Sequence, residues 1–136
     1  MKVVVDTNIV FSAFLSKNSK YRDLLFDDKY ELYSPNFVFL EIFKHKAKIL
    51  KCTKESELEV YSFMGNMLKR INFVKEEVVS AENYEKANIL CRETDENDTP
   101  FVALALEIGG YLLTGDEKLK RALKIKGFDR FLLVKM

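Results

Sequence analysis

The segment VVVDTNIVF, residues 3–11, constrains the fold more than any other part of the chain. Its three consecutive valines predict a short buried strand, and Asp6 follows them directly. A carboxylate at the end of a core strand is costly to bury, or takes up a proton, unless a positive charge lies beside it. The segment therefore predicts a central strand with a functional carboxylate at its end.

The rest of the chain alternates between short apolar runs and helical patterns. We expect strands at residues 2–5, 30–33, 73–79, 111–114 and 131–134, and helices at residues 9–15, 21–26, 35–50, 53–70, 80–92, 99–108 and 116–127. Ser34-Pro35 and Thr99-Pro100 each predict a helix start, with an N-cap followed by proline, and Gly109-Gly110 predicts a helix end. The alternation indicates one α/β domain over residues 1–136 with a mostly parallel sheet.

Composition limits the classes of partner and compartment. The 22 basic and 21 acidic residues give a net charge of +1, so binding to a polyanion must come from local patches. Cys52 and Cys91 show no metal-binding or redox spacing, which predicts reduced thiols. No apolar stretch approaches the roughly 20 residues of a membrane-spanning helix. We expect a soluble, cytoplasmic protein.

Four carboxylates occupy unusual positions. Asp6 and Asp116 each follow a predicted strand, and ligand sites of parallel sheets lie beyond the carboxyl ends of their strands. Asp98 directly precedes the Thr-Pro helix start, where negative charge is favoured. Glu41 stands inside the apolar run FVFLEIF, residues 37–43, although acids are rarely buried alone.

Each of these acids also has an ordinary explanation. Asp98 and Asp116 could serve only as N-caps, and Glu41 could pair with Lys44 or Lys48 at helical spacing. Asp6 could be the strand-end acid of a receiver-like or dinucleotide-binding domain. Four carboxylates at one sheet edge would however repel one another, and a hard divalent cation with oxygen ligands removes that cost. Together the four acids predict a site for Mg²⁺ or Mn²⁺.

The segments DTNIVFSAFL, ENDTPFVALAL and LLTGDEKL, in this order, resemble the PIN domain family. The family consists of metal-dependent ribonucleases, many of them VapC-like toxins of toxin–antitoxin pairs. The resemblance implies a three-layer α/β/α fold with a central, mostly parallel sheet of four to five strands. It also implies metal-dependent cleavage of RNA that leaves a 5′-phosphate and a 3′-hydroxyl.

The resemblance assigns roles to individual residues. Four residues match the catalytic, metal-binding acids of the family: Asp6, Glu41, Asp98 and Asp116. Asn8 and Thr114 match polar positions that support these ligands, and Asp95 matches an extra acid that some members use. A second metal ion would need Glu41 and could require bound substrate.

Two basic runs, residues 44–54 and 118–126, begin near proposed ligands and could bind the phosphates of an RNA substrate. Within these runs we select as candidate RNA-binding residues Lys44, Lys48, Lys118 and Arg121. The alternative is that these residues only form solvated faces of their helices. His45 in the first run is expected to be a surface residue. The apolar residues of 37–43 suggest a homodimer interface or a groove for an antitoxin protein, unless they form a phenylalanine-rich core.

Other enzyme classes fit less well. A haloacid dehalogenase-type phosphatase needs a second aspartate where this chain has Asn8, and the GxxxxGK loop of P-loop enzymes is absent. A receiver domain needs paired acids and a late lysine that are not evident. The sequence thus predicts a metal-dependent endoribonuclease, with a catalytically silent PIN-like module that binds RNA or a partner as the alternative.

Overall fold

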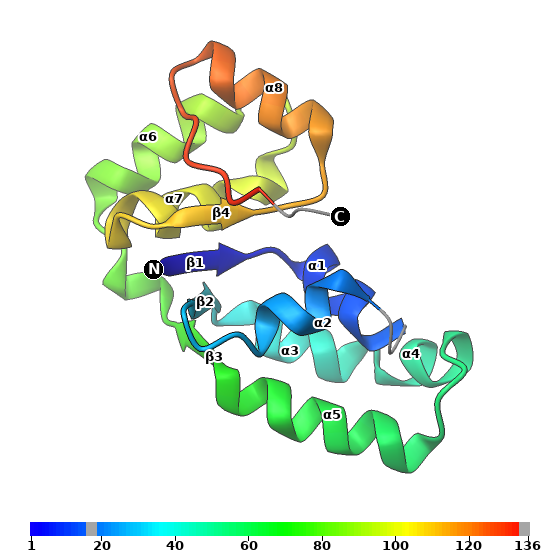
Figure 1. Cartoon of the computed structure of the whole chain (residues 1–136). Coiled ribbons are helices and arrows are strands. Elements are labelled where there is room, and N and C mark those ends of the chain that lie inside the picture. Colours follow the sequence, from blue (N-terminus) through cyan, green and yellow to red (C-terminus); the bar gives the residue numbers. More distant parts are fainter. Residues whose placement is uncertain (16–18, 134–136) are drawn as a thin grey trace.

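The structure is a computed structural model that describes residues 1–15 and 19–133. Its four-stranded sheet has the order β3-β2-β1-β4, and all neighbouring strands run parallel (Figure 1). The strands are β1 (Lys2–Val5), β2 (Glu31–Pro35), β3 (Ile71–Val74) and β4 (Tyr111–Leu113). The expected parallel sheet with a central first strand is confirmed.

Helices flank this sheet, so the expected α/β/α fold is confirmed as well (Figure 1). They are α1 (Thr7–Leu15), α2 (Lys20–Leu25), α3 (Phe37–Lys44), α4 (Lys46–Cys52), α5 (Glu57–Arg70), α6 (Ala81–Cys91), α7 (Thr99–Ile108) and α8 (Glu117–Ile125), with short 3₁₀ turns at Glu76–Val78 and Glu96–Asp98. Helix α7 packs across β1, β2 and β4, with α6 against it, while α1 contacts α2, α4 and α5. None of the helices in this part of the chain is long and apolar enough to reach across a lipid bilayer.

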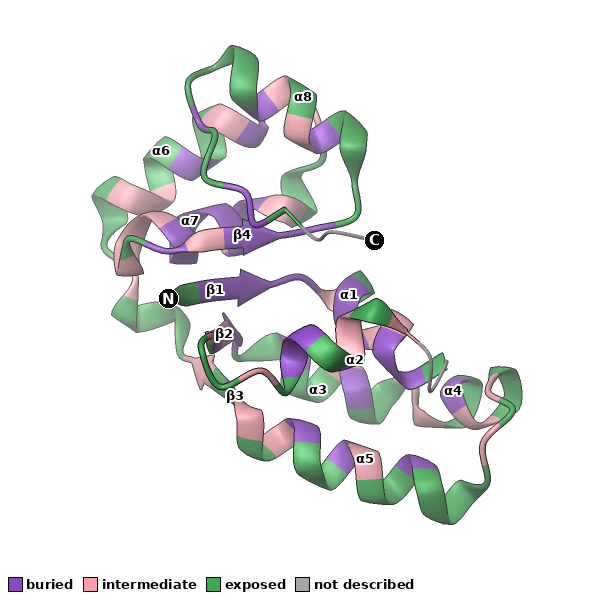
Figure 2. Ribbon diagram, in the orientation of Figure 1, coloured by how far each residue is buried: buried purple, intermediate pink, exposed green. Residues whose placement is uncertain are grey.

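The core forms around β1, which lies between β2 and β4 and is packed against α7, and only its first residue, Lys2, is exposed. Val3, Val4 and Val5 have no exposed surface, and the buried side of α7 continues this apolar layer (Figure 2). Full burial of a valine side chain stabilises a fold by roughly 1.5–3 kcal/mol. The strand that leads to Asp6 is thereby held rigidly in the middle of the sheet.

The prediction that Ser34-Pro35 starts a helix is wrong. Both residues end β2, and α3 begins after Asn36. The Ser34 hydroxyl donates to the Val5 carbonyl at 3.0 Å instead of capping a helix. Pro35 lies beyond the last β1–β2 pair, so its missing N–H removes no bond to β1.

Three predicted helix boundaries also differ. The helix predicted over residues 35–50 divides at His45 into α3 and α4. Thr53 does not start α5, because Ser56 and Glu59 form a capping box that begins the helix three residues later. Thr99 is not an N-cap but a buried residue of the first turn of α7, and Asp98 occupies the cap position.

Two predicted strands are shorter than expected. The strand predicted over residues 73–79 is replaced by β3 and the 3₁₀ turn that follows it. Near the C-terminus, Phe131 forms a single parallel bridge with Leu112, and residue 134 lies outside the described residues. Gly109 does end α7, with a φ of 63° that favours glycine. Cys52 and Cys91 are free thiols, as expected.

Candidate functional site

Acidic side chains surround a cavity of about 720 Å³ beyond the carboxyl end of β1. Asp6 comes from the end of β1, Glu41 from α3, and Asp95 and Asp98 from the turn before α7. The remaining lining residues are Thr7, Asn8, Phe37, Tyr84, Glu96, Asn97, Pro100 and Phe101. Segments that are far apart in the sequence thus bring five acids, Glu96 included, to one cavity, which we call the acidic cavity.

Asp6 is held in place by hydrogen bonds although it is only 8% exposed. Its Oδ1 accepts a hydrogen bond of 2.9 Å from the backbone N–H of Ile9, which caps α1. The Thr114 hydroxyl and the backbone N–H of Asn8 also bond to the carboxylate. Burial nevertheless raises the pKa of Asp6, and the negative charge of Asp116 raises it further.

Asp98 shows the electrostatic cost of the site most clearly. Its pKa rises from 3.8 to about 6, mainly because burial disfavours the charged carboxylate. The negative charges of Asp95, Asp116 and Asp6 raise it further, in that order. Because its side chain makes no capping bond to α7, no such contact offsets this repulsion.

Asp116 lies next to the acidic cavity without lining it. Its carboxylate accepts a hydrogen bond of 3.0 Å from the Leu119 N–H and so caps α8, as predicted. Its backbone N–H donates to the Thr114 hydroxyl at 3.2 Å, the same hydroxyl that bonds to Asp6. Thr114 therefore links the two acids that follow β1 and β4, and both act electrostatically on Asp98.

Glu41 lies at the same cavity as Asp6, although its surroundings carry little sequence signal. Its side chain is 35% exposed and contacts His45 Nε2 at 3.2 Å, not Lys44 or Lys48 as the ordinary explanation supposed. The His45 ring in turn packs edge-on against Phe11, with ring centroids 5.8 Å apart. His45 thus orients Glu41 and is not itself among the residues that line the acidic cavity.

The secondary candidates divide into two groups. Asn8 and Asp95 line the acidic cavity, and the Asp95 carboxylate accepts a hydrogen bond of 2.9 Å from the Asn97 N–H. The four basic candidates are exposed and belong to α3, α4 and α8: Lys44, Lys48, Lys118 and Arg121. None of these four lines the acidic cavity.

Sequence reasoning did not select Phe37 and Tyr84, two of the three aromatic residues that line the cavity, beside Phe101. Phe37 belongs to the apolar run around Glu41 but was not assigned to a site. Tyr84 comes from α6, whose sequence carries no motif. Only the packing of α3 and α6 around α7 brings both rings to the acidic cavity.

The chemistry of the side chains suits a hard divalent cation, because the candidate ligands offer only oxygen atoms. Within residues 1–15 and 19–133, no three acidic, histidine or cysteine side chains converge closely enough to ligate one ion. Three neighbouring aspartates nevertheless lie close enough to Asp98 for their negative charges to raise its pKa.

Comparison with known proteins gives three findings. A family model described as PIN domain matches residues 4–133. An uncharacterized protein of Methanocaldococcus jannaschii is 30% identical over 122 residues, which cover 88% of this chain and 73% of that protein. The fold is similar to a crystal structure of VapBC2 from Rickettsia felis bound to a DNA fragment from their promoter, with a TM-score of 0.65, 20% identity, and coverage of 90% of this chain and 93% of that chain.

Proposed function

The chain belongs to the PIN domain family, and from this premise we propose that it is a divalent-metal-dependent endoribonuclease and a VapC-like toxin of a toxin–antitoxin pair. PIN domains are generally metal-dependent nucleases. The observation that carries the proposal is the crowding of carboxylates around Asp98, whose pKa rises to about 6. A cluster with this degree of repulsion is what a bound cation would stabilise.

Asp6, Asp98 and Asp116 would hold the cation. Glu41 and Asp95, which line the acidic cavity, would be further ligands. When bound, Mg²⁺ or Mn²⁺ supplies positive charge that activates an attacking water and stabilises the leaving oxygen of the phosphodiester. The chain contributes orientation: the Thr114 hydroxyl and the Ile9 N–H fix the carboxylate of Asp6. Asn8 lines the cavity beside them and would support the ligands.

RNA would bind from the solvent side of the acidic cavity. We propose that Lys44 and Lys48, which follow Glu41 along α3 and α4, hold phosphates on one side. Lys118 and Arg121 of α8 would do so near Asp116. Such contacts weaken as salt concentration rises, because binding a polyanion releases counterions.

A protein partner would cover the exposed apolar surface of α3. Phe37, Phe39, Leu40 and Phe43 are between 37% and 67% exposed, so the expected excess of apolar surface is present. The similar fold in the VapBC2 complex supports an antitoxin as this partner, and a homodimer would bury the same kind of surface. We place this pair in the cytoplasm, where RNA is available.

The decisive experiment measures cleavage of a fluorogenic RNA in Mn²⁺, in Mg²⁺ and in EDTA, with wild type and Asp6→Asn. Asp6→Asn keeps the size of the side chain, and its amide oxygen can still accept the Ile9 N–H bond. We expect cleavage by wild type with metal only, and a loss of at least about a hundredfold in the variant, with an unchanged circular dichroism spectrum. Asp28→Asn, at an exposed acid outside the cavity, is the matched control.

Two outcomes would contradict the proposal. Retained cleavage by Asp6→Asn would exclude the carboxylate mechanism. RNA binding without cleavage under every metal condition would instead favour the catalytically silent PIN-like binding module.

A further inference from the structure

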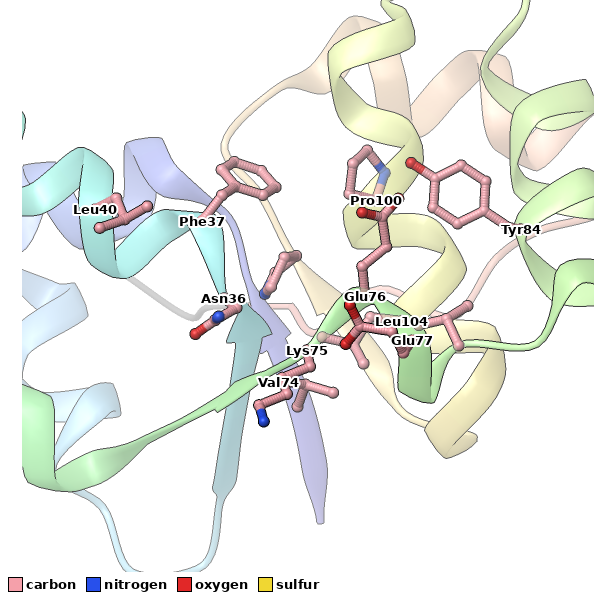
Figure 3. A pocket seen from close by; sticks show the side chains of 12 residues that line it. Asn36, Phe37, Leu40, Val74, Lys75, Glu76, Glu77, Tyr84, Pro100 and Leu104 are labelled. Carbon is pink, nitrogen blue, oxygen red and sulfur yellow. The ribbon is translucent and has the colours of Figure 1, made fainter.

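A second cavity, of about 660 Å³, adjoins the acidic cavity and has a different character. It lies between the end of β2 and β3, α3, α6 and α7, and we call it the side cavity (Figure 3). Its apolar walls include Leu40, Val74, Val79 and Leu104. Nothing in the proposed chemistry at the carboxylates uses this space.

The two cavities share part of their walls. Phe37, Tyr84 and Pro100 line both of them, so a chain bound at the acidic cavity reaches the side cavity without crossing another element. Figure 3 shows these three rings around the side cavity, each from a different helix. A group attached to a phosphate at the acidic cavity would therefore meet these rings first.

The shared wall presents flat surfaces that suit a nucleobase. Phe37 is 40% exposed, and its ring is held edge-on against Phe101 with centroids 5.6 Å apart. Tyr84 is partly buried, so its ring is also held by its surroundings. Single-stranded RNA is commonly bound by stacking of its bases on such aromatic side chains.

The charges of the side cavity exclude the RNA backbone but admit a base. Glu76 and Glu77 line it together with a single basic residue, Lys75. Two carboxylates repel a phosphate, whereas they accept hydrogen bonds from the N–H groups of a base. Glu76 and Tyr84 line this cavity together, and burial, followed by the negative charge of Glu76, raises the pKa of the Tyr84 phenol.

We propose that the side cavity binds one unpaired nucleobase of the RNA, next to the phosphate that is cleaved, and that it prefers guanine. Of the four bases, only guanine has two adjacent donors on its Watson–Crick edge, N1–H and the N2 amino group, which can both bond to one carboxylate. Phe37 and Tyr84 would stack on the base, and Glu76 would select it. The proposal rests on the proposed ribonuclease function for the identity of the substrate.

Binding can be measured without cleavage, in EDTA, by quenching of 2-aminopurine placed at successive positions of a short single-stranded RNA. The four nucleoside monophosphates then compete for the bound RNA. We expect GMP to compete best with wild type, and Phe37→Ala to bind the RNA about fivefold to a hundredfold more weakly. Phe43→Ala, on the same helix and similarly exposed at 45%, lines neither cavity and should bind as wild type does.

A second variant keeps the proposal testable if Phe37→Ala does not fold. Glu76→Gln changes an exposed side chain to one that both donates and accepts, and it should abolish the advantage of GMP while leaving overall affinity within about threefold. Glu82→Gln, an exposed glutamate outside both cavities, should leave the order of the four nucleotides unchanged.

The outcomes separate this inference from the proposed function. Equal competition by all four nucleotides, or equal weakening by Phe37→Ala and Phe43→Ala, would overturn the base site even if the enzyme cleaves RNA with Mn²⁺. A GMP preference that Glu76→Gln removes would support the base site. If the same wild-type protein then failed to cleave RNA with metal, only the nuclease would be refuted.

Discussion

Replacement of Asp98 tests the electrostatic reasoning directly. The pKa of this carboxyl is raised from 3.8 to about 6, so the folded state binds more protons than the unfolded state between these pH values. The contribution of Asp98 to the stability of the metal-free protein must therefore fall as pH rises from about 4 to about 6, and it must stay lower above pH 6. Asp98→Asn removes the charge and with it this loss of stability.

The size of the effect follows from the same shift. A difference of about 2 in pKa corresponds to about 3 kcal/mol, and screening by solvent at this partly exposed side chain reduces it to about 1–2 kcal/mol. In EDTA at pH 7.5 we expect Asp98→Asn to increase the free energy of unfolding by this amount, which raises Tm by roughly 3–8 °C. The substitution breaks no capping bond, because the Asp98 side chain makes none to α7.

The assay is thermal unfolding followed by circular dichroism at pH 4 and pH 7.5, with EDTA or with excess Mn²⁺. The two proteins should converge at pH 4, where the wild-type carboxyl is protonated. Excess Mn²⁺ at about a hundred times its Kd should stabilise wild type by about 2.7 kcal/mol and the variant by less. Asp28→Asn serves as the control at an exposed acid. If Asp98→Asn were less stable than wild type in EDTA at pH 7.5, the repulsion described here would not exist.

Two further predictions concern stability alone and use urea denaturation. Gly65→Ala should stabilise the protein by about 0.5–1 kcal/mol, because Gly65 lies within α5 and an added Cβ meets nothing within 4 Å. Gly109→Ala should destabilise it by about 1–2 kcal/mol, because the φ of Gly109 is 63°. Changes of equal sign in the two variants would contradict this. Arg22→Met should cost about 3–5 kcal/mol, because it leaves the Glu55 carboxylate, bound by Arg22 at 2.6 Å and only 7% exposed, without its charged partner. The double variant Arg22→Met with Glu55→Met should recover part of that loss, and a double variant as unstable as the single one would refute this explanation.

The local part of the site was predictable because local sequence determines it. The apolar side chains of Val3–Val5 are stable only when they are buried in the core, so Asp6 must lie at the end of a buried strand. Asp116 was predictable for a similar reason, since a short polar side chain after a strand readily caps the next helix. Asp98 and Glu41 were selected from the Thr-Pro helix start and the apolar run 37–43, and the family resemblance then matched both to its acids.

Features that depend on distant contacts were less predictable. Ser34-Pro35 has the residue types of a helix start, but the Val5 carbonyl that accepts the Ser34 hydroxyl belongs to another strand. Helical spacing alone could not choose the partner of Glu41, because it offers both Lys44 and His45, and the imidazole four residues along the chain is the group that contacts it. The side cavity is lined by residues from β2, β3, α3, α6 and α7 and the turn after β3, so no single stretch of sequence contains it.

The strand order has a consequence for the timing of assembly during synthesis. The strand that pairs with one edge of β1 is β4, which is the last of the four sheet strands in chain order. Until it emerges from the ribosome, β1 has an unpaired edge, and Asp6 lacks the hydroxyl that orients it. The acidic cluster therefore assembles only when β4 has joined the sheet, because Thr114 and Asp116 directly follow that strand.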